Sequence, residues 1–229
     1  MKVDDNVAII SAGSEHSMYV KKDGSLWVMG RNWYGELGTG KNGNDGNWQN
    51  YYNSFKEDFD ESEPIKIDDS VISISAGDIH SLYVKADGSL WSMGLNERGQ
   101  LGDVTLFNRN SPIKVLDSDV HFVSAGAQIS AFVKSDGSLW KLGSSIVKID
   151  DDVIAMSCGY DDIFYVKSDH TLWNIGFNLT ETGGGENDFT EDLNATPTLL
   201  DDNVLFVSAD NSFEGEEVLY QKKDGTVWT

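Results

Sequence analysis

The chain repeats one short pattern five times, and this repetition constrains the fold more than any other feature. The first two copies, residues 7–30 and 71–94, read VAIISAGSEHSMYVKKDGSLWVMG and VISISAGDIHSLYVKADGSLWSMG. Two more copies span residues 120–143 and 153–176, and a fifth begins at Val204. The repeat tryptophans are unevenly spaced, at Trp27, Trp91, Trp140, Trp173 and Trp228. A constant pattern at uneven spacing predicts one structural unit that carries loops of different lengths.

Each copy is predicted to form four antiparallel strands, termed a to d, as the second copy illustrates. Residues 71–76 alternate with the period of a β-strand, and residues 80–85 are rich in aromatic and β-branched side chains. Asp87-Gly88 predicts a two-residue hairpin between strands b and c, and Pro112 opens strand d. No segment has a sustained 3.6-residue apolar period. This pattern predicts an all-β chain, a β-propeller of four-stranded antiparallel blades with four full repeats and a partial fifth.

The repeat resembles the regulator of chromosome condensation repeat, whose family builds seven-bladed propellers. The first two copies carry the string SAGxxHSxYVKxDGSLWxMGxNxxGxLG. The resemblance implies a member of bacterial type, or a fragment of one. The third copy has Ile129 where His16 and His80 stand, and it lacks the NxxGxLG segment. The fourth copy has Asp162 at that position and His170 in place of the hairpin glycine. We therefore expect no ring of identical functional residues.

The chain is expected to form a single, incomplete propeller domain, residues 1–229. Its start, MKVDD, aligns with IKIDD at residues 65–69, so the chain begins within a strand d and ends late in a strand c. One arrangement is a fragment of a seven-bladed ring, and the other is a closed five-bladed ring in which Met1–Val3 pair with the last strand c. We expect the fragment, and an open stack is disfavoured because exposed edges invite aggregation. The repeats span about 7–67, 71–116, 120–149, 153–200 and 204–229.

The acidic composition narrows the classes of partner. Asp and Glu number 38 against 17 Lys and Arg, a formal net charge of −21. Without a basic stripe, such a surface predicts no binding to nucleic acid or to an anionic membrane. No stretch approaches the roughly 18 apolar residues of a membrane-spanning helix, and no signal peptide follows Met1. The single Cys158 leaves the compartment open, either cytoplasmic or, for a fragment of a longer protein, secreted or at the cell surface.

Strand order predicts two different rims. The d–a turns are rich in Asp and the b–c hairpins are rich in Lys, and both fall on one rim. We expect these charges to be solvated, with a rim that binds a cation or a basic partner as the alternative. The opposite rim carries the c–d loops, which differ in length between copies, and variable loops on a rigid scaffold are where binding commonly occurs.

The candidate binding residues lie in the c–d loops. Aromatic side chains are the usual anchors of protein interfaces, and the loop at residues 31–63 interleaves them with Asn and Gly. The alternative is that this loop folds back and buries its aromatics on its own blade, and both remain open. The candidates are Trp33, Tyr34, Trp48, Tyr51, Tyr52, Phe55, Glu97, Arg98, Phe177 and Phe189.

No catalytic, metal or cofactor site is expected. Cys158 occupies the position of a repeated alanine, which predicts a small packed residue, and His16 and His80 recur at one position, which predicts a hydrogen-bonding blade element. Zinc would need several closely spaced Cys or His. Residues 42–47, NGNDGN, faintly resemble a calcium loop but lack its alternating acidic ligands and terminal Glu.

The repeat tryptophans are expected to pack between blades. Some members of the family sense ultraviolet light through clustered tryptophans. Here Val28-Met29, Ser92-Met93, Lys141-Leu142 and Asn174-Ile175 follow the first four tryptophans, so a second aromatic residue is missing. We therefore do not expect this activity.

The sequence favours a non-catalytic scaffold that presents variable loops to an unidentified protein partner. One alternative is a guanine-nucleotide exchange regulator of a small GTPase, which the resemblance implies because the best-known member has that activity. Its chromatin docking is not expected here, because the surface is acidic. The other alternative is a propeller lyase or hydrolase with His and carboxylates at the central channel. Two further copies lack the histidine, which weighs against it. Missing blades of a longer chain are a further possible partner.

Overall fold

A computed structural model describes residues 2–41, 60–176, 179–181, 189–191, 195–210 and 217–229. The regular elements of these residues are all strands, and no helix among them could cross a membrane. Four sheets have four antiparallel strands in sequential order, and a fifth sheet has three. The prediction of an all-β propeller of four-stranded blades is therefore confirmed.

The strand bounds follow the repeats. The first blade contains β1 (Val7–Ala12), β2 (His16–Lys21), β3 (Leu26–Gly30) and β4 (Glu61–Asp68). The second contains β5 (Val71–Ala76), β6 (His80–Lys85), β7 (Leu90–Gly94) and β8 (Arg109–Leu116). The third contains β9 (Val120–Ala125), β10 (Ser130–Lys134), β11 (Leu139–Leu142) and β12 (Val147–Asp150).

The last two blades complete the series. The fourth contains β13 (Val153–Cys158), β14 (Asp162–Lys167), β15 (Leu172–Gly176) and β18 (Thr198–Asp201). A small hairpin, β16 (Leu179–Glu181) and β17 (Phe189–Glu191), lies between β15 and β18. The fifth contains β19 (Val204–Ala209), β20 (Val218–Lys222) and β21 (Val227–Trp228).

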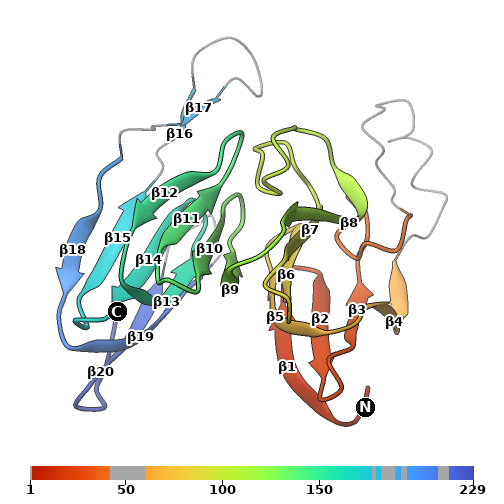
Figure 1. Cartoon of the computed structure of the whole chain (residues 1–229), viewed down its shortest axis with the longest axis horizontal. Helices are drawn as coiled ribbons and strands as arrows, with labels where there is room; N and C mark the ends of the chain where they lie inside the picture. The colour runs from red at the N-terminus through yellow and green to blue at the C-terminus, as the bar shows by residue number, and fades with distance from the viewer. Residues whose placement is uncertain (1, 42–59, 177–178, 182–188, 192–194, 211–216) are drawn as a thin grey trace.

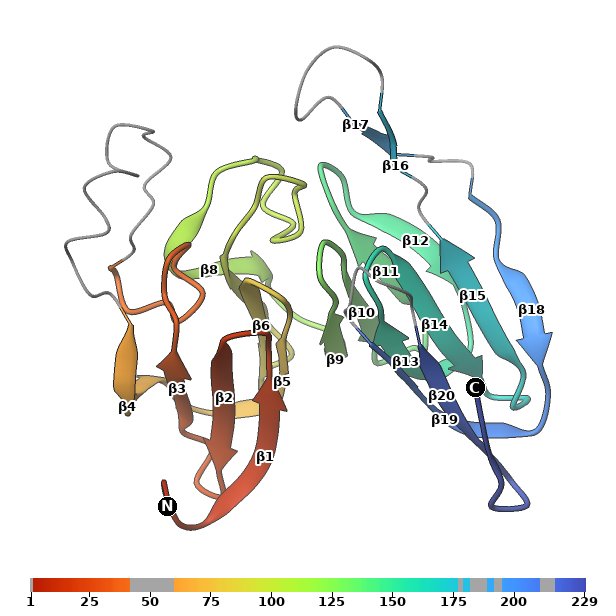
Figure 2. The same ribbon diagram turned by 180° about the vertical axis from the view of Figure 1, so that it is seen from behind.

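The blades follow one another along an open arc (Figures 1 and 2). In both views the sheet β1–β4 and the sheet β19–β21 lie on opposite sides of the molecule. Lys2 and Val3 belong to no strand, and β21 has only β20 as its neighbour. Met1, the first of the residues that a closed five-bladed ring would pair with the last strand c, lies outside the described residues.

The hydrophobic core consists of four separate clusters, one at each junction between consecutive blades. In the first junction, Met18 and Leu26 of one blade pack with Val71 and Ile74 of the next. The same positions form the cores of the second, third and fourth junctions. Trp91, Trp140 and Trp173 pack against three of these clusters, as predicted for the repeat tryptophans.

Hydrogen bonds also join the blades at repeated positions. The hydroxyl of Ser11 in β1 accepts the N–H of Ala76 in β5 at 2.9 Å. The equivalent bonds join Ser75 to Ala125, Ser124 to Cys158 and Ser157 to Ala209, also at 2.9 Å. Since each bond crosses from one strand a to the next, strand a holds the inner edge of every junction.

Strand a does not alternate strictly, because a bulge lies near its start. In β5 the register shifts between Val71 and Ser73, so Val71 and Ile74 are both buried and Ile72 is exposed. The other strands a have the same irregularity. An extra residue on one strand reverses the facing of the residues beyond it, and the predicted simple period of two is corrected at this point.

The b–c hairpins also differ from the prediction of a two-residue turn. Lys85 donates its N–H to Ser89 and Gly88 donates its N–H to Lys85, so three residues form the loop. Gly88 has a positive φ of 81°, whereas Asp87 does not have a positive φ. This is a type I turn closed by a left-handed glycine, and the Asp87 carboxylate accepts the N–H and hydroxyl of Ser89.

Candidate functional site

The two rims of the arc carry different connections, as predicted. At one rim the a–b turns lie beside the c–d loops, since the N–H of Arg31 donates to the carbonyl of Glu15. At the other rim the b–c hairpin of one blade meets the d–a turn of the next, where the N–H of Val71 donates to the carbonyl of Gly24. We call the first of these the variable-loop rim.

At four d–a turns of the opposite rim, an aspartate is paired with a lysine of the following strand b. In the first blade the Asp4 carboxylate accepts hydrogen bonds from the Tyr19 hydroxyl at 2.9 Å and from Lys21 Nζ at 2.8 Å. The same trio recurs three times, as Asp68–Tyr83–Lys85, Asp150–Tyr165–Lys167 and Asp201–Tyr220–Lys222. These contacts hold the pKa of Asp4 well below its usual range, mainly through Lys21. The repeated Asp and Lys of this rim are thus accounted for by the blades themselves.

On the variable-loop rim, a buried asparagine organises the c–d loop of the second blade. Asn96 donates from Nδ2 to Asp103 Oδ1 at 2.9 Å and to the carbonyl of Thr105 at 3.0 Å. Its Oδ1 accepts the N–H of Leu101 at 2.9 Å. Asn32 does the same in the first blade, with Thr39, Lys41 and Leu37. This explains why the repeat pattern has Asn two residues after the last glycine of strand c.

An ion pair fixes the far end of the same loop. Arg109, the first residue of β8, donates from Nε to Asp103 Oδ2 at 2.7 Å. Asp103 also accepts the N–H and hydroxyl of Thr105. The side chain of Asp103 is largely buried, and its hydrogen bonds hold its pKa below the usual range against the opposing effect of burial. The loop is therefore held in one conformation by polar contacts at both ends.

This loop exposes an apolar tip. Val104, Leu106 and Phe107 are 72%, 57% and 74% exposed. Val104 has a φ of 56°, in the left-handed region that a β-branched residue avoids. Such a conformation costs on the order of 1–3 kcal/mol and persists only where its surroundings impose it. A strained backbone that displays three apolar side chains to solvent is typical of a binding loop rather than of a solubilising one.

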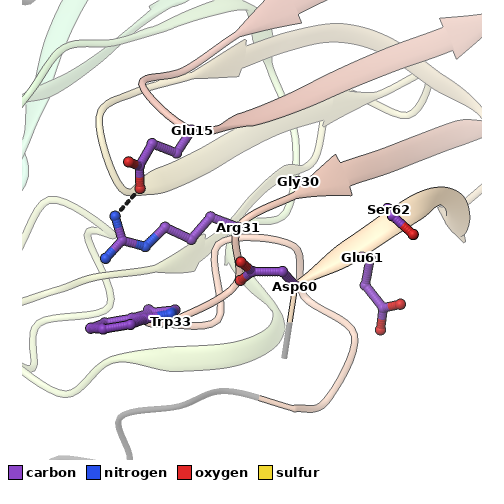
Figure 3. Close-up of a pocket in the computed structure, with 7 residues that line it drawn as sticks. All are labelled: Glu15, Gly30, Arg31, Trp33, Asp60, Glu61 and Ser62. Carbon is purple, nitrogen blue, oxygen red and sulfur yellow. Dashed lines mark hydrogen bonds and ion pairs between the residues drawn. The ribbon is translucent and has the colours of Figure 1, made fainter. Parts of the chain in front are cut away.

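A shallow pocket lies on the first blade (Figure 3). It has a volume of about 600 Å³ and is lined by Glu15, Gly30, Arg31, Trp33, Asp60, Glu61 and Ser62. The guanidinium of Arg31 lies 4.3 Å from the centre of the Trp33 ring and is paired with the carboxylate of Glu15. The pocket therefore combines a cation–π pair with a surplus of carboxylates.

The first c–d loop packs against the start of β8 in the second blade. Gly40 donates its N–H to the carbonyl of Asn110, and Asn110 Nδ2 donates to the carbonyl of Gly40. Gly35 lies so close to Arg109 and Asn110 that a Cβ there would approach their backbone to between 2.4 and 2.8 Å. This close approach requires glycine. It holds the first c–d loop against the start of β8 in the second blade.

A buried carboxyl group supports the first loop. Glu36 is 1% exposed and accepts the N–H groups of Trp33 and Tyr34 at 3.2 and 2.7 Å. Burial raises its pKa from 4.5 to about 7, against the opposing effects of these amides and of Arg31. The second blade has Gln100 at this position, where its Oε1 accepts the N–H of Arg98 at 3.0 Å. The site thus suits a neutral side chain.

The predicted binding residues divide into three groups. Trp33 and Tyr34 are half-buried on the variable-loop rim, Glu97 is exposed and Arg98 is half-buried. Phe189 lies in β17, and only its backbone is described. Trp48, Tyr51, Tyr52, Phe55 and Phe177 lie outside the described residues. Trp33 and Tyr34 thus lie on the variable-loop rim, and their backbone N–H groups donate hydrogen bonds to the carboxyl group of Glu36.

Sequence reasoning missed the apolar tip. Val104, Leu106 and Phe107 follow Gly102-Asp103 within a segment interpreted only as a connecting loop. The available signal was an apolar run between Gly and Asn that has neither a helical nor a strand period. Such a run does not fit a strand of the blade. In a loop on the variable-loop rim, it indicates a binding site.

The histidines and the cysteine have structural roles, as predicted. His16 and His80 are buried, and their Nε2 atoms hydrogen bond to Ser81 Oγ and Ser130 Oγ of the next blade at 2.8 and 2.7 Å. Burial lowers the pKa of both imidazoles, to about 4 and about 3. Cys158 is buried, and burial raises the pKa of its thiol to about 12.

At the third junction an apolar pair stands where the first two junctions have a His–Ser pair. Ile129 and Ile163 occupy these positions, and both are buried in the same core cluster. No group of three or more His, Cys, Asp or Glu arranged to hold a metal ion is found within the described parts of the chain.

Family models for the regulator of chromosome condensation (RCC1) repeat match this chain at residues 7–36 and 71–100, and at residues 23–84 and 87–133. The ultraviolet-B receptor UVR8 of Arabidopsis thaliana is 28% identical over 116 residues, which cover 49% of this chain and 22% of that protein. The chain spans less than a quarter of the length of this curated relative.

Solved structures share the fold over almost the whole chain. The crystal structure of human WBSCR16 superposes with a TM-score of 0.73 at 18% identity, covering 96% of this chain and 60% of that one. Yeast RCC1 (Prp20), in its crystal structure bound to Kap60, gives a TM-score of 0.67 at 17% identity, covering 96% and 55%. At these identities the likeness concerns the fold alone.

Proposed function

Because this chain belongs to the regulator of chromosome condensation (RCC1) repeat family, whose fold displays loops on a rigid scaffold, we propose that it is a non-catalytic scaffold that binds a protein partner through its variable-loop rim. The observation that carries this proposal is the apolar tip of Val104, Leu106 and Phe107, which is exposed although its loop is locked by Asn96, Asp103 and Arg109. A pre-organised loop loses little conformational entropy on binding, which favours affinity.

The chemistry of the rim suggests the kind of partner surface. Leu106 and Phe107 of the second blade offer apolar anchors, and the pocket of the first blade offers the carboxylates of Glu15, Asp60 and Glu61. The whole chain carries a formal charge of −21, which attracts positively charged surfaces and repels nucleic acid. We therefore propose a partner protein whose contact surface combines apolar side chains with basic ones. The related yeast protein is itself seen bound to a protein, Kap60.

The placement of the histidines supports a non-catalytic role. His16 and His80 are the residues that a lyase or hydrolase would use at the central channel, and both are buried against serines of the next blade. Their lowered pKa values follow from this burial. Substrate turnover that is lost in His16→Ala or His80→Ala, with the fold intact, would contradict the proposal.

Affinity capture of a partner protein, from an extract of cells that naturally produce this chain, tests the binding surface. The bait is the whole chain, and the variant is Leu106→Ser with Phe107→Ser. We expect a specific protein to be retained by the wild type and lost from the variant. The matched control is Ile72→Ser with Ile154→Ser, which removes two exposed isoleucines near the opposite rim. Equal retention by wild type and loop variant, or equal loss from both variants, would show that the tip is not the binding surface.

A further inference from the structure

Half-buried polar residues are interleaved with exposed apolar ones along the c–d loop of the second blade. The half-buried set is Asp103, Thr105 and Asn108, and the exposed set is Val104, Leu106 and Phe107. The segment from Val104 to Asn108 has no charged side chain. The loop therefore presents an uncharged, largely apolar tip between positions that are held by the blade.

Two residues outside the tip hold the chain on both sides of the Leu106–Phe107 peptide bond. Before the bond, Asn96 donates from Nδ2 to the carbonyl of Thr105 at 3.0 Å, and Arg109 Nη2 donates to the Thr105 hydroxyl at 3.2 Å. After the bond, the N–H of Asn96 donates to Asn108 Oδ1 at 2.8 Å. Asn96 is fully buried, so one fixed residue holds both flanks of the same peptide bond.

A further hydrogen bond spans the Leu106–Phe107 bond itself. The N–H of Phe107 donates to the Thr105 hydroxyl at 3.3 Å. The nitrogen that cleavage would release as an amino group is thus bound to a residue that precedes the bond. Hydrogen bonds that flank one peptide bond add little to docking on a flat surface. They matter where that bond is attacked, because they keep the two new chain ends together.

We propose that this loop inhibits a serine protease with an apolar specificity pocket, which Leu106 enters, so that the Leu106–Phe107 bond lies at the nucleophile of the protease. This inference rests on the proposed function, since it names the class of partner that the variable-loop rim binds. An apolar pocket suits Leu106 because neither the pocket nor the tip carries a charge. The anchored loop loses little conformational entropy on binding, which favours the tight association typical of protease–inhibitor pairs.

The anchoring hydrogen bonds explain how the loop binds without being consumed. Attack by the serine of the protease forms a bond from its oxygen to the carbonyl carbon of Leu106, and the bond from that carbon to the Phe107 nitrogen breaks. The serine proton passes through the histidine of the protease to that nitrogen. Because Thr105 and Asn108 both stay bound to Asn96, the new amino group remains beside the acyl carbon. Its return attack reforms the peptide bond and releases the serine.

Inhibition of chymotrypsin and of trypsin tests the proposal, with the whole chain as inhibitor and a chromogenic peptide as substrate. Chymotrypsin has an apolar specificity pocket, whereas the pocket of trypsin carries an aspartate. We expect the wild type to inhibit chymotrypsin competitively at about 1 µM or below, and not to inhibit trypsin. Leu106→Lys should lose about a hundredfold in affinity for chymotrypsin and gain inhibition of trypsin. Ile154→Lys adds the same charge at an exposed isoleucine near the opposite rim and should behave like the wild type.

A second variant tests the role of the anchoring hydrogen bonds. Arg109→Lys keeps a positive charge beside Asp103 but lacks the planar fork that binds Asp103 and Thr105 together. We expect chymotrypsin to cleave the wild type slowly at the Leu106–Phe107 bond and to cleave the variant about tenfold faster there. Mass spectrometry of the incubated chain identifies the bond, and circular dichroism checks that the variant retains the fold.

Three outcomes overturn the proposal. They are a wild type that does not inhibit chymotrypsin, a Leu106→Lys variant that inhibits it equally well, and a wild type that is cleaved as fast as Arg109→Lys. Failure of this inference can be distinguished from failure of the proposed function. If affinity capture depends on Leu106 and Phe107 but chymotrypsin is not inhibited, the variable-loop rim binds a protein of another class. If neither capture nor inhibition depends on these residues, both proposals are wrong.

Discussion

Equivalent positions of different blades sometimes hold different residues, so the blades can be compared with one another. Glu36 is the clearest case. The first two blades build the same turn, NxxGxLG, with Glu36 in one and Gln100 in the other. Both side chains are buried, and each accepts a backbone N–H from the same turn. Glutamine is the neutral counterpart of a protonated glutamic acid. The sequence variation and the raised pKa of Glu36 therefore agree that the site favours an uncharged side chain.

The variant Glu36→Gln is expected to change how stability depends on pH. Because the pKa of Glu36 rises from 4.5 in the unfolded chain to about 7 in the folded one, its protonated form stabilises the fold fully below pH 4.5. This contribution is lost as the pH rises from there through 7. Relative to the wild type, the variant should gain on the order of 3 kcal/mol between about pH 5 and pH 8. Urea unfolding at both pH values measures it.

The comparison isolates one group, since all other titrating residues are the same in both proteins. His16 and His80 act in the opposite direction, because their lowered pKa values favour the folded state at higher pH. A stability difference that stays constant from pH 5 to pH 8 would mean that Glu36 is ionised in the fold.

For single residues, the sequence predicted the structural role better than it predicted which residues make the contact. The recurrence of His16 and His80, and of Cys158 among alanines, was enough to predict structural roles that the contacts confirm. The serines that bond to the histidines lie 65 and 50 positions away. A pattern within one copy cannot reveal a contact between copies. The apolar pair Ile129 and Ile163 became interpretable only when the blades were seen side by side.

The element on which the proposed binding surface rests is the c–d loop of the second blade. It is anchored by the buried Asn96, by the ion pair between Asp103 and Arg109, and by packing of Gly99 and Gly102 against the third blade. Its tip contributes nothing to the core. The strain at Val104 is thus retained where the anchors at both sides impose it.

Val104→Asn is expected to stabilise the protein by about 1 kcal/mol, because asparagine tolerates the left-handed region better than a β-branched residue does. Val104 is exposed, so the substitution removes little packing. Thermal unfolding measures the gain. Leu106→Asn is the control, since it removes an equally exposed apolar side chain at a position without a positive φ, and it should leave stability unchanged. Equal effects of both substitutions would mean that no strain is stored at Val104.

Elements were predictable where they follow a period. Strands a to d, the two rims and the uneven c–d loops follow from the repeat. The bulge at Ile72 and the three-residue hairpins do not, because a single inserted residue leaves the pattern of apolar residues nearly unchanged. The conformation of the loop at residues 103–108 depends on contacts with Asn96 and Arg109, and these two residues are not neighbours of each other in the sequence.

At the scale of the whole molecule, stability is distributed over junctions rather than concentrated in one core. Each of the four clusters contains residues from two consecutive blades. The energetics should therefore resemble those of a linear array in which each repeat contacts only its neighbours. Within the described chain, Ile10 of the first blade and Val227 of the fifth are exposed.

A matched pair of truncations tests this distribution. Leu90→Ala removes a buried side chain from the second junction and should cost about 2–5 kcal/mol. Val227→Ala changes the equivalent position of the last blade, where the side chain is exposed, and should cost less than about 0.5 kcal/mol. Chemical denaturation at low protein concentration measures both. Similar costs would mean that the last blade is covered by another part of the protein.

We propose that the variable-loop rim, and not the opposite rim, contacts a partner protein. Site-specific photo-crosslinking in the producing cells tests it most directly, with a benzophenone amino acid placed at position 107 in one chain and at position 72 in another. Both sites are exposed, and they lie toward opposite rims. We predict a crosslinked protein adduct from position 107 that position 72 does not give. An adduct from position 72 alone, or the same adducts from both positions, would contradict binding through the variable-loop rim.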